Sequence, residues 1–166
     1  MKETSVILLV VNEQTLIYQL EQAFRKNSLR HPIRVARYGN EALLYLKGIG
    51  VYSNRQLYPL PDLLVLDLAN PDGSSMVLLG WIREQKIFNT IPIVIMVSNE
   101  HDRVLQNALD LGANAFVVKR DEQLELISLI KSLELLGEIS NREKPEQDKN
   151  DFPGTLEFFR IDPPSV

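Results

Sequence analysis

The chain has 166 residues, of which 18 are basic and 22 acidic, and its formal net charge is −4. This length suits one well-buried core and is short for two ordinary domains. The absence of cysteine excludes disulfides and thiolate metal sites, and the absence of a basic stripe predicts no nucleic-acid partner. The apolar run near Met1 is too short for a signal peptide or a membrane span, so we expect a cytoplasmic protein with no membrane partner.

Short apolar runs rich in Val, Ile and Leu alternate with amphipathic segments of helical length. The predicted strands cover residues 6–11, 33–38, 63–68, 91–97 and 115–118. Each is followed by apolar residues at helical spacing, namely Leu16, Leu20, Ala23 and Phe24; Ala42, Leu43 and Leu46; Met76, Leu79 and Ile82; Val104, Ala108 and Leu111; and Leu124, Ile127, Ile130 and Leu133. This alternation predicts an α/β fold with a parallel sheet, covered by helices on both faces because the runs are continuous.

Cap residues and breakers mark the ends of several helical segments. Asn40 is the predicted N-cap of the second helix, which ends at Gly48. Asn99 is the predicted N-cap of the fourth helix, and Gly112 ends it. A loop with two prolines and two tyrosines, residues 51–61, precedes the third strand.

Two side chains that carry chemistry stand at the ends of predicted strands. Asp67 ends the run LPDLLVLDL, and Lys119 follows fifty-two residues later at the end of AFVVK. Open α/β folds bind ligands at the carboxyl ends of their parallel strands, so this pair marks the candidate site. The sequence around the pair lacks the further acids that a catalytic centre of this kind would need.

The last part of the chain differs in composition from the rest. From Ser140 the sequence is polar and charged without a period, so we place the domain boundary there, with residues 1–139 as the domain and 140–166 as a tail. The tail ends in an apolar and aromatic segment that includes Phe158 and Phe159. This segment either covers an apolar strip of its own domain or docks on a partner or a second copy.

Four motifs together resemble the receiver domains of two-component response regulators, over about residues 5–137. They are ILLVVNE, LPDLLVLDL with Pro71 four residues after Asp67, IPIVIMVSN, and LGANAFVVKR. The loop before the third strand is similar to that of the small receivers associated with phytochrome-type kinases. The resemblance implies a doubly wound, flavodoxin-like sheet of order 2-1-3-4-5. It also implies that Asp67 is at the phosphoacceptor position, Lys119 at the lysine position and Phe116 at the aromatic switch position.

Several positions depart from the pattern of that family. Val11 and Asn12 stand where receivers have a pair of acids, and Val97 stands where they have Thr or Ser. Arg120 replaces the proline that usually follows the lysine, and Ser75 replaces a glycine. The resemblance therefore implies a degenerate site.

The departures have a chemical consequence. Phosphoryl transfer to a carboxylate brings negative charges together, and proteins manage it with a divalent cation held by several oxygens. Asp67 is the one acid that we can place in the site, and Lys119 already balances its charge. We therefore expect no cofactor, no magnesium site and no enzymatic activity.

Two functions remain open. The first is an atypical receiver that acts as a protein-interaction module, with Asp67 and Lys119 as a buried ion pair. The second is a working phosphoacceptor that a sensor histidine kinase phosphorylates on Asp67. A flavin-binding module is excluded by the lack of a glycine-rich loop after the first strand, and a haloacid dehalogenase-type phosphatase by Ala69, where a second acid would stand.

The resemblance implies a partner-binding face on the fourth helix, fifth strand and fifth helix. The candidate contact residues there are Arg103, Asp110 and Arg120, and the partner would be a sensor kinase, another regulator or a second copy. We expect Phe116 to be a core or half-buried ring and Trp81 to cover the face of the third helix. His31 and His101 are predicted surface residues without partners.

Overall fold

The computed structural model describes residues 6–26, 31–70, 72–99, 103–119, 128, 129 and 131. Its strands are β1 (Ile7–Val10), β2 (Ile33–Ala36), β3 (Leu63–Asp67), β4 (Ile93–Val97) and β5 (Ala115–Val118). They form one parallel sheet of order β2-β1-β3-β4-β5, the doubly wound, flavodoxin-like order expected from the sequence. The predicted strand positions are confirmed, although four of the five strands are shorter than predicted by one or two residues at an end.

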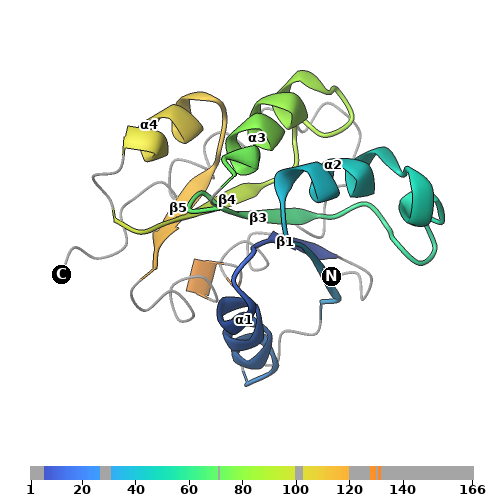
Figure 1. Ribbon diagram of the computed structural model, residues 1–166, viewed down its shortest axis with the longest axis horizontal. Coiled ribbons are helices and arrows are strands. Elements are labelled where there is room, and N and C mark those ends of the chain that lie inside the picture. The colour runs from blue at the N-terminus through green and yellow to red at the C-terminus, as the bar shows by residue number, and fades with distance from the viewer. Residues whose placement is uncertain are drawn as a thin grey trace.

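Helices lie on both faces of this sheet. They are α1 (Gln14–Lys26), α2 (Gly39–Lys47), α3 (Ser74–Glu84) and α4 (Arg103–Asp110), with a short 3-10 helix η1 (Gly50–Ser53) after α2. Figure 1 shows α1 on one face and α2, α3 and α4 on the other. Residues 120–127, 130 and 132–166 lie outside the described residues, and with them the boundary at Ser140, the tail and the predicted fifth helix except for residues 128, 129 and 131, which are helical.

The strand side chains fill two apolar layers. Leu8 and Val10 of β1 belong to the layer under α2, α3 and α4, whereas Ile7 and Leu9 point into the layer under α1. Successive side chains of a strand point to opposite faces, so a continuous apolar run serves both layers. β2 is at the edge of the sheet, and three of its four residues are half-buried.

The start of α2 differs from the prediction. The helix begins at Gly39, with Tyr38 and not Asn40 at its N-cap. The Gly39 N–H donates to the Ser74 hydroxyl at 2.6 Å, and a side chain on Gly39 would collide with the Ser74 backbone. The start of α3 thus provides the acceptor that a local cap would otherwise supply. Asn40 lies inside the first turn, where its Oδ1 accepts from the Glu41 N–H.

The apolar stripe of α4 also differs from the prediction. The buried residues are Leu105 and Ala108, while Leu111 is 42% exposed and Val104 is half-buried. Ala108 lies at helical spacing from both Val104 and Leu105, so it belongs to two possible apolar stripes. Packing against the sheet buries the stripe that contains Leu105.

The predicted burial of individual aromatic and histidine side chains can be compared with the structure. The prediction that His31 lies at the surface is wrong: it is 5% exposed and stands two residues before β2, where the carbonyl of its neighbour Pro32 accepts from the Ile7 N–H of β1. Phe116 is a core ring, as predicted, and is also 5% exposed. Trp81 is half-buried on α3, where its ring contacts Phe88. His101 lies outside the described residues.

Two arginines hold the ends of helices. Arg55 donates from Nη1 to the Tyr45 carbonyl and from Nη2 to the Leu46 carbonyl, both at 2.7 Å, at the end of α2. Arg83 of α3 donates to the Gly112 carbonyl after α4 and to Asn114 Oδ1 before β5. Burial lowers the pKa of Arg83 to about 10, which leaves its guanidinium charged at neutral pH.

Within the described part of the chain, no helix is long and apolar enough to span a membrane.

Candidate functional site

The carboxyl ends of the central strands bring the two candidate site residues together. Asp67 is the last residue of β3 and is opposite Met96 of β4. Lys119 directly follows β5, and its backbone N–H donates to the Val97 carbonyl at the end of β4. β3, β4 and β5 therefore end at one edge, as the parallel topology requires.

Asp67 and Lys119 form an ion pair at this edge. Lys119 Nζ lies 2.6 Å from Asp67 Oδ2, and the side chains of Lys119 and Asp67 are 15% and 5% exposed, respectively. The other carboxylate oxygen, Oδ1, accepts from the Ala69 N–H at 2.9 Å. Each oxygen of Asp67 thus has a donor, and the pair is neutral as a whole.

The connection from β3 to α3 holds the backbone of Asp67 as well. The buried Ser75 hydroxyl donates to the Asp67 carbonyl at 3.1 Å, and the Asn70 N–H approaches the same carbonyl at 3.3 Å. Asn70 is itself buried, and its Nδ2 donates to the Arg37 carbonyl at 2.9 Å. This network fixes both the carboxylate and the strand end that carries it.

Sequence analysis missed the role of this connection. Asp72 Oδ1 accepts from both the N–H and the hydroxyl of Ser74, which lowers the pKa of the Asp72 carboxyl. The Ser74 oxygen in turn accepts from the N–H of Gly39. The motif NPDG at residues 70–73 is a turn signal that could have marked the segment, but its partners in the second helix are not visible in the sequence.

The remaining neighbours of the site are mostly apolar. Val11 is fully buried, Asn12 is half-buried, and Val97 and Phe116 are both buried. Across the described ranges, no group of three or more His, Cys, Asp or Glu side chains could hold a metal ion. Val11 and Asn12 offer one neutral oxygen between them, and both Asp67 oxygens already accept hydrogen bonds. Among the described residues, the site therefore presents one carboxylate, whose charge Lys119 balances, and one neutral amide oxygen.

Two of the predicted partner-binding residues lie on α4, and the other three lie outside the described residues. Arg103 and Asp110 are exposed at the two ends of α4, and Asp110 Oδ1 accepts from Gln106 at 2.9 Å. Arg120, Phe158 and Phe159 lie outside the described residues.

The chain is similar in sequence and in fold to known response regulators. The response regulator Rcp1 of Synechocystis sp. is 23% identical over 129 residues, which cover 78% of this chain and 86% of Rcp1. The crystal structure of the phosphorylated cyanobacterial phytochrome response regulator RcpA superimposes with a TM-score of 0.67 at 26% identity and covers 79% of this chain and 91% of RcpA. The bacteriophytochrome response regulator AtBRR gives a TM-score of 0.67 at 32% identity over 78% of this chain and 92% of AtBRR. A sequence model of the response regulator receiver domain matches residues 7–131, and the chain therefore belongs to that family of two-component signalling domains.

Proposed function

We propose that this receiver is atypical: a protein-interaction module in signal transduction that works without magnesium-dependent phosphorylation of Asp67. The observation that carries the proposal is the closed Asp67 carboxylate, with Lys119 Nζ at 2.6 Å from one oxygen and the Ala69 N–H at 2.9 Å from the other. A phosphoryl group bonded to either oxygen would have to be accommodated beside the donor already bound there.

Electrostatics supports the same proposal. The Asp67–Lys119 pair is neutral, and the buried Val11 contributes no charge or ligand beside it. A divalent cation placed there would repel the Lys119 ammonium without further carboxylates to compensate. Acceptance of a phosphoryl group without such a cation would leave the added negative charge to Lys119 alone.

The positions that the family uses to respond to phosphorylation support the proposal too. Val97 is apolar and buried, so its side chain has no hydroxyl that could bind a phosphoryl oxygen. Phe116 lies inside the core, opposite Ile95 of β4. Neither Val97 nor Phe116 has a polar group through which contact with a phosphoryl group would favour a second arrangement.

The proposed activity is binding to another signalling protein in the cytoplasm, such as a sensor kinase or a second regulator, or to a second copy. Arg103 and Asp110 of α4, together with Arg120, are the candidate contacts on the folded face. Phe158 and Phe159 are the candidate contacts in the tail, because aromatic side chains are frequent anchors of interfaces. The proposal includes no catalytic step and no nucleic-acid partner.

The second candidate is a phosphoacceptor that a sensor histidine kinase phosphorylates on Asp67. Two observations favour it: the carboxylate and the lysine are both present at the correct strand ends, and the related RcpA was crystallised in a phosphorylated form.

Magnesium titration separates the two candidates. We expect isothermal titration calorimetry of the full chain to show no magnesium binding in the millimolar range or tighter, because Asp67 is the one acid at the site. An isotherm of that strength that is lost in Asp67→Ala would support the phosphoacceptor instead.

A gain-of-binding variant tests whether the site is correctly placed. Val11→Asp combined with Asn12→Asp should create magnesium affinity, and it should destabilise the metal-free protein because three carboxylates then repel one another. If this variant remains folded and still binds no magnesium, positions 11 and 12 do not face Asp67 and the proposal loses its basis.

A further inference from the structure

The connection between α2 and β3 is rich in exposed apolar side chains. Among the described residues, nine large apolar side chains are at least 37% exposed. Four of these nine come from α2 and the following connection, namely Leu44, Ile49, Val51 and Leu57, with Val51 at 73% and Leu57 at 60%. We refer to residues 48–61 as the 48–61 surface. Exposed apolar side chains that are concentrated in one segment mark contact sites more often than scattered single ones do.

Three tyrosines support this surface from within. The rings of Tyr52 and Tyr58 are in edge contact, with centroids 5.1 Å apart, and both rings contact Tyr45 of α2. The Tyr45 hydroxyl donates to the Pro59 carbonyl at 2.8 Å. Val51 and Leu57 are sequence neighbours of the two contacting rings, so the ring contact brings the two halves of the connection together. The surface is therefore held in place before any ligand arrives, which reduces the entropic cost of binding.

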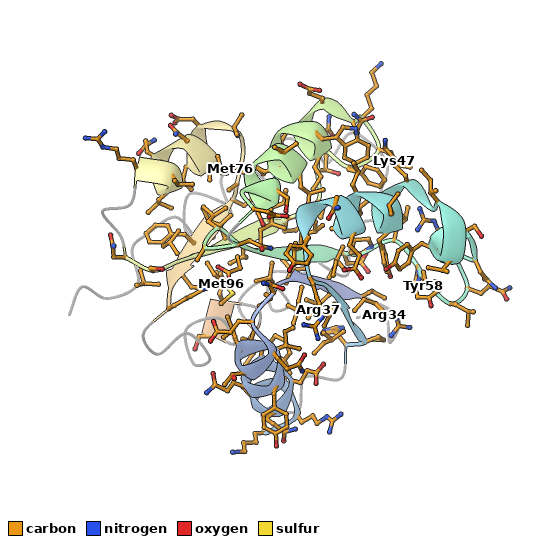
Figure 2. The ribbon with its side chains drawn as sticks, in the orientation of Figure 1. Arg34, Arg37, Lys47, Tyr58, Met76 and Met96 are labelled. Atoms are coloured by element: carbon orange, nitrogen blue, oxygen red, sulfur yellow. The ribbon has the colours of Figure 1, made fainter. Side chains whose placement is uncertain are left out.

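The charge of this surface indicates what would bind to it. Residues 48–61 contain no acid, although the chain has 22 acidic residues. Arg34 crosses from β2 to donate to the Leu57 carbonyl at 3.1 Å, and Figure 2 shows it beside Tyr58. The two nearest acids in sequence, Glu41 and Asp62, accept hydrogen bonds from Tyr52 and from the Val6 N–H. A ligand with apolar side chains and negative charge fits such a surface, whereas the same surface of a second copy would bring like charges together.

The chain contains a segment with this chemistry. Residues 151–162, DFPGTLEFFRID, have three acids and one base, a net charge of −2, and they include Leu156, Phe158, Phe159 and Ile161. Twenty residues separate Lys131 from Asp151, and a chain of this length spans up to roughly 70 Å. A domain of this size has a radius of gyration of about 14 Å. The segment can therefore reach the 48–61 surface of its own domain.

We propose that residues 151–162 dock on the 48–61 surface of the same chain, with aromatic side chains against Ile49, Val51 and Leu57. This contact would cover the apolar cluster and would place the acids of the segment near Arg34 and Arg55. It does not depend on the proposed signalling role, because it concerns two segments of one chain. A partner that binds either element would have to compete with the contact.

Paramagnetic broadening in the full chain tests the proposal. The sequence has no cysteine, so Ser165→Cys gives a single site for a spin label next to the segment. We expect the amide signals of Ile49, Val51 and Leu57 to lose intensity when the label is active and to recover when it is reduced. Exposed apolar positions on α1 and α3, Tyr18 and Val77, serve as references and should keep their intensity. Broadening centred on the references, or no residue-specific broadening, would overturn the proposal.

Two controls sharpen the test. Val51→Asp with Leu57→Asp should abolish the broadening, while Val77→Asp with Ile87→Asp, at positions of similar exposure, should leave it unchanged. Broadening that survives the first pair of substitutions would contradict the proposed contact. A mixture of isotope-labelled chain without the spin label and spin-labelled chain without isotopes should show none, since broadening there would mean that the segment of a second copy is bound.

Discussion

Asp67 is held by four donors, which come from the residue after β5, from the connection that follows β3 and from α3. Lys119 and the Ala69 N–H bind its carboxylate. The Ser75 hydroxyl and the Asn70 N–H bind its carbonyl. A carboxylate in this state is held in one orientation, with one donor at each oxygen. Buried ion pairs add little net stability, because desolvation of both charges offsets their attraction, yet the loss of one partner is costly.

A double-mutant cycle on this pair gives the first prediction at the residue scale. Asp67→Ala and Lys119→Met should each lower the free energy of unfolding by about 3 kcal/mol, because each leaves a desolvated charge behind. The double variant should lose less than either single variant, so the coupling energy should reach about 3 kcal/mol or more, the upper end of the range for residues in contact. Urea denaturation measures all four proteins.

The exposed pair on α4 provides a matched control. Gln106 and Asp110 also share one hydrogen bond, at 2.9 Å, but both side chains are exposed. Their alanine cycle should give a coupling of about 0.5 kcal/mol or less. Equal coupling in the two cycles would show that burial does not strengthen the contact between Asp67 and Lys119.

At the scale of elements, α2 and η1 are joined through one acid. Glu41 of α2 accepts from the Tyr52 hydroxyl of η1 at 3.0 Å and from the Arg37 N–H before the helix at 2.9 Å. Burial, followed by this hydrogen bond to Glu41, raises the pKa of Tyr52 to about 12. Burial also raises the pKa of Tyr45. The connection that carries the 48–61 surface is thus tied to α2 by groups whose protonation is measurable.

The raised pKa of Tyr52 predicts a loss of stability at high pH. The folded protein binds the phenolic proton more tightly than the unfolded chain, in which the pKa of tyrosine is 10.0. The contribution is therefore complete below pH 10 and is lost as the pH rises towards about 12. Ultraviolet titration should show a late-ionising tyrosine that disappears in Tyr52→Phe, together with a weaker decline of stability in this range. Tyr18→Phe, at a position 60% exposed, should leave the late-ionising fraction unchanged.

At the scale of the whole molecule, the described domain leaves an apolar cluster on its surface, and the tail carries an apolar segment. Replacement of Phe158 and Phe159 by Ser tests what the tail contributes. If the segment docks on its own domain, as proposed, the free energy of unfolding should fall by about 2 kcal/mol and association with a partner or second copy should persist. Thermal unfolding and sedimentation measure the two quantities on the full chain.

Docking of the tail on a partner or a second copy predicts the opposite changes in stability and association. If the tail docks on a partner or a second copy, stability should hold and association should weaken. Val77→Ser with Ile87→Ser, two exposed apolar residues of the domain, is the control for a general effect of lost apolar surface. If neither stability nor association changes, the tail has no part in the function and the α4 face alone remains as the proposed contact.

The sequence by itself determined the order of the strands and helices along the chain and the two charged residues of the site, Asp67 and Lys119. Continuous apolar runs fixed the five strands because both sheet faces are covered, and each run lies within two residues of its strand. Asp67 and Lys119 could be placed because parallel strands end at one edge, and this rule needs no knowledge of side-chain packing. The roles assigned to Val11, Asn12 and Val97 came from the resemblance to receiver domains and remain predictions.

Only the tertiary structure decided which local signal prevails where two compete. Asn40 is a good cap by residue type, but Ser74, thirty-five residues from Gly39, accepts the hydrogen bond of the first helical N–H. Ala108 belongs to two possible apolar stripes of α4, and contact with the sheet buries Leu105 together with Ala108. The hydrogen bond from the Ser75 hydroxyl of α3 to the Asp67 carbonyl is equally invisible in the sequence. In each case the deciding group is distant along the chain, and local periodicity and residue preference carry no information about such contacts.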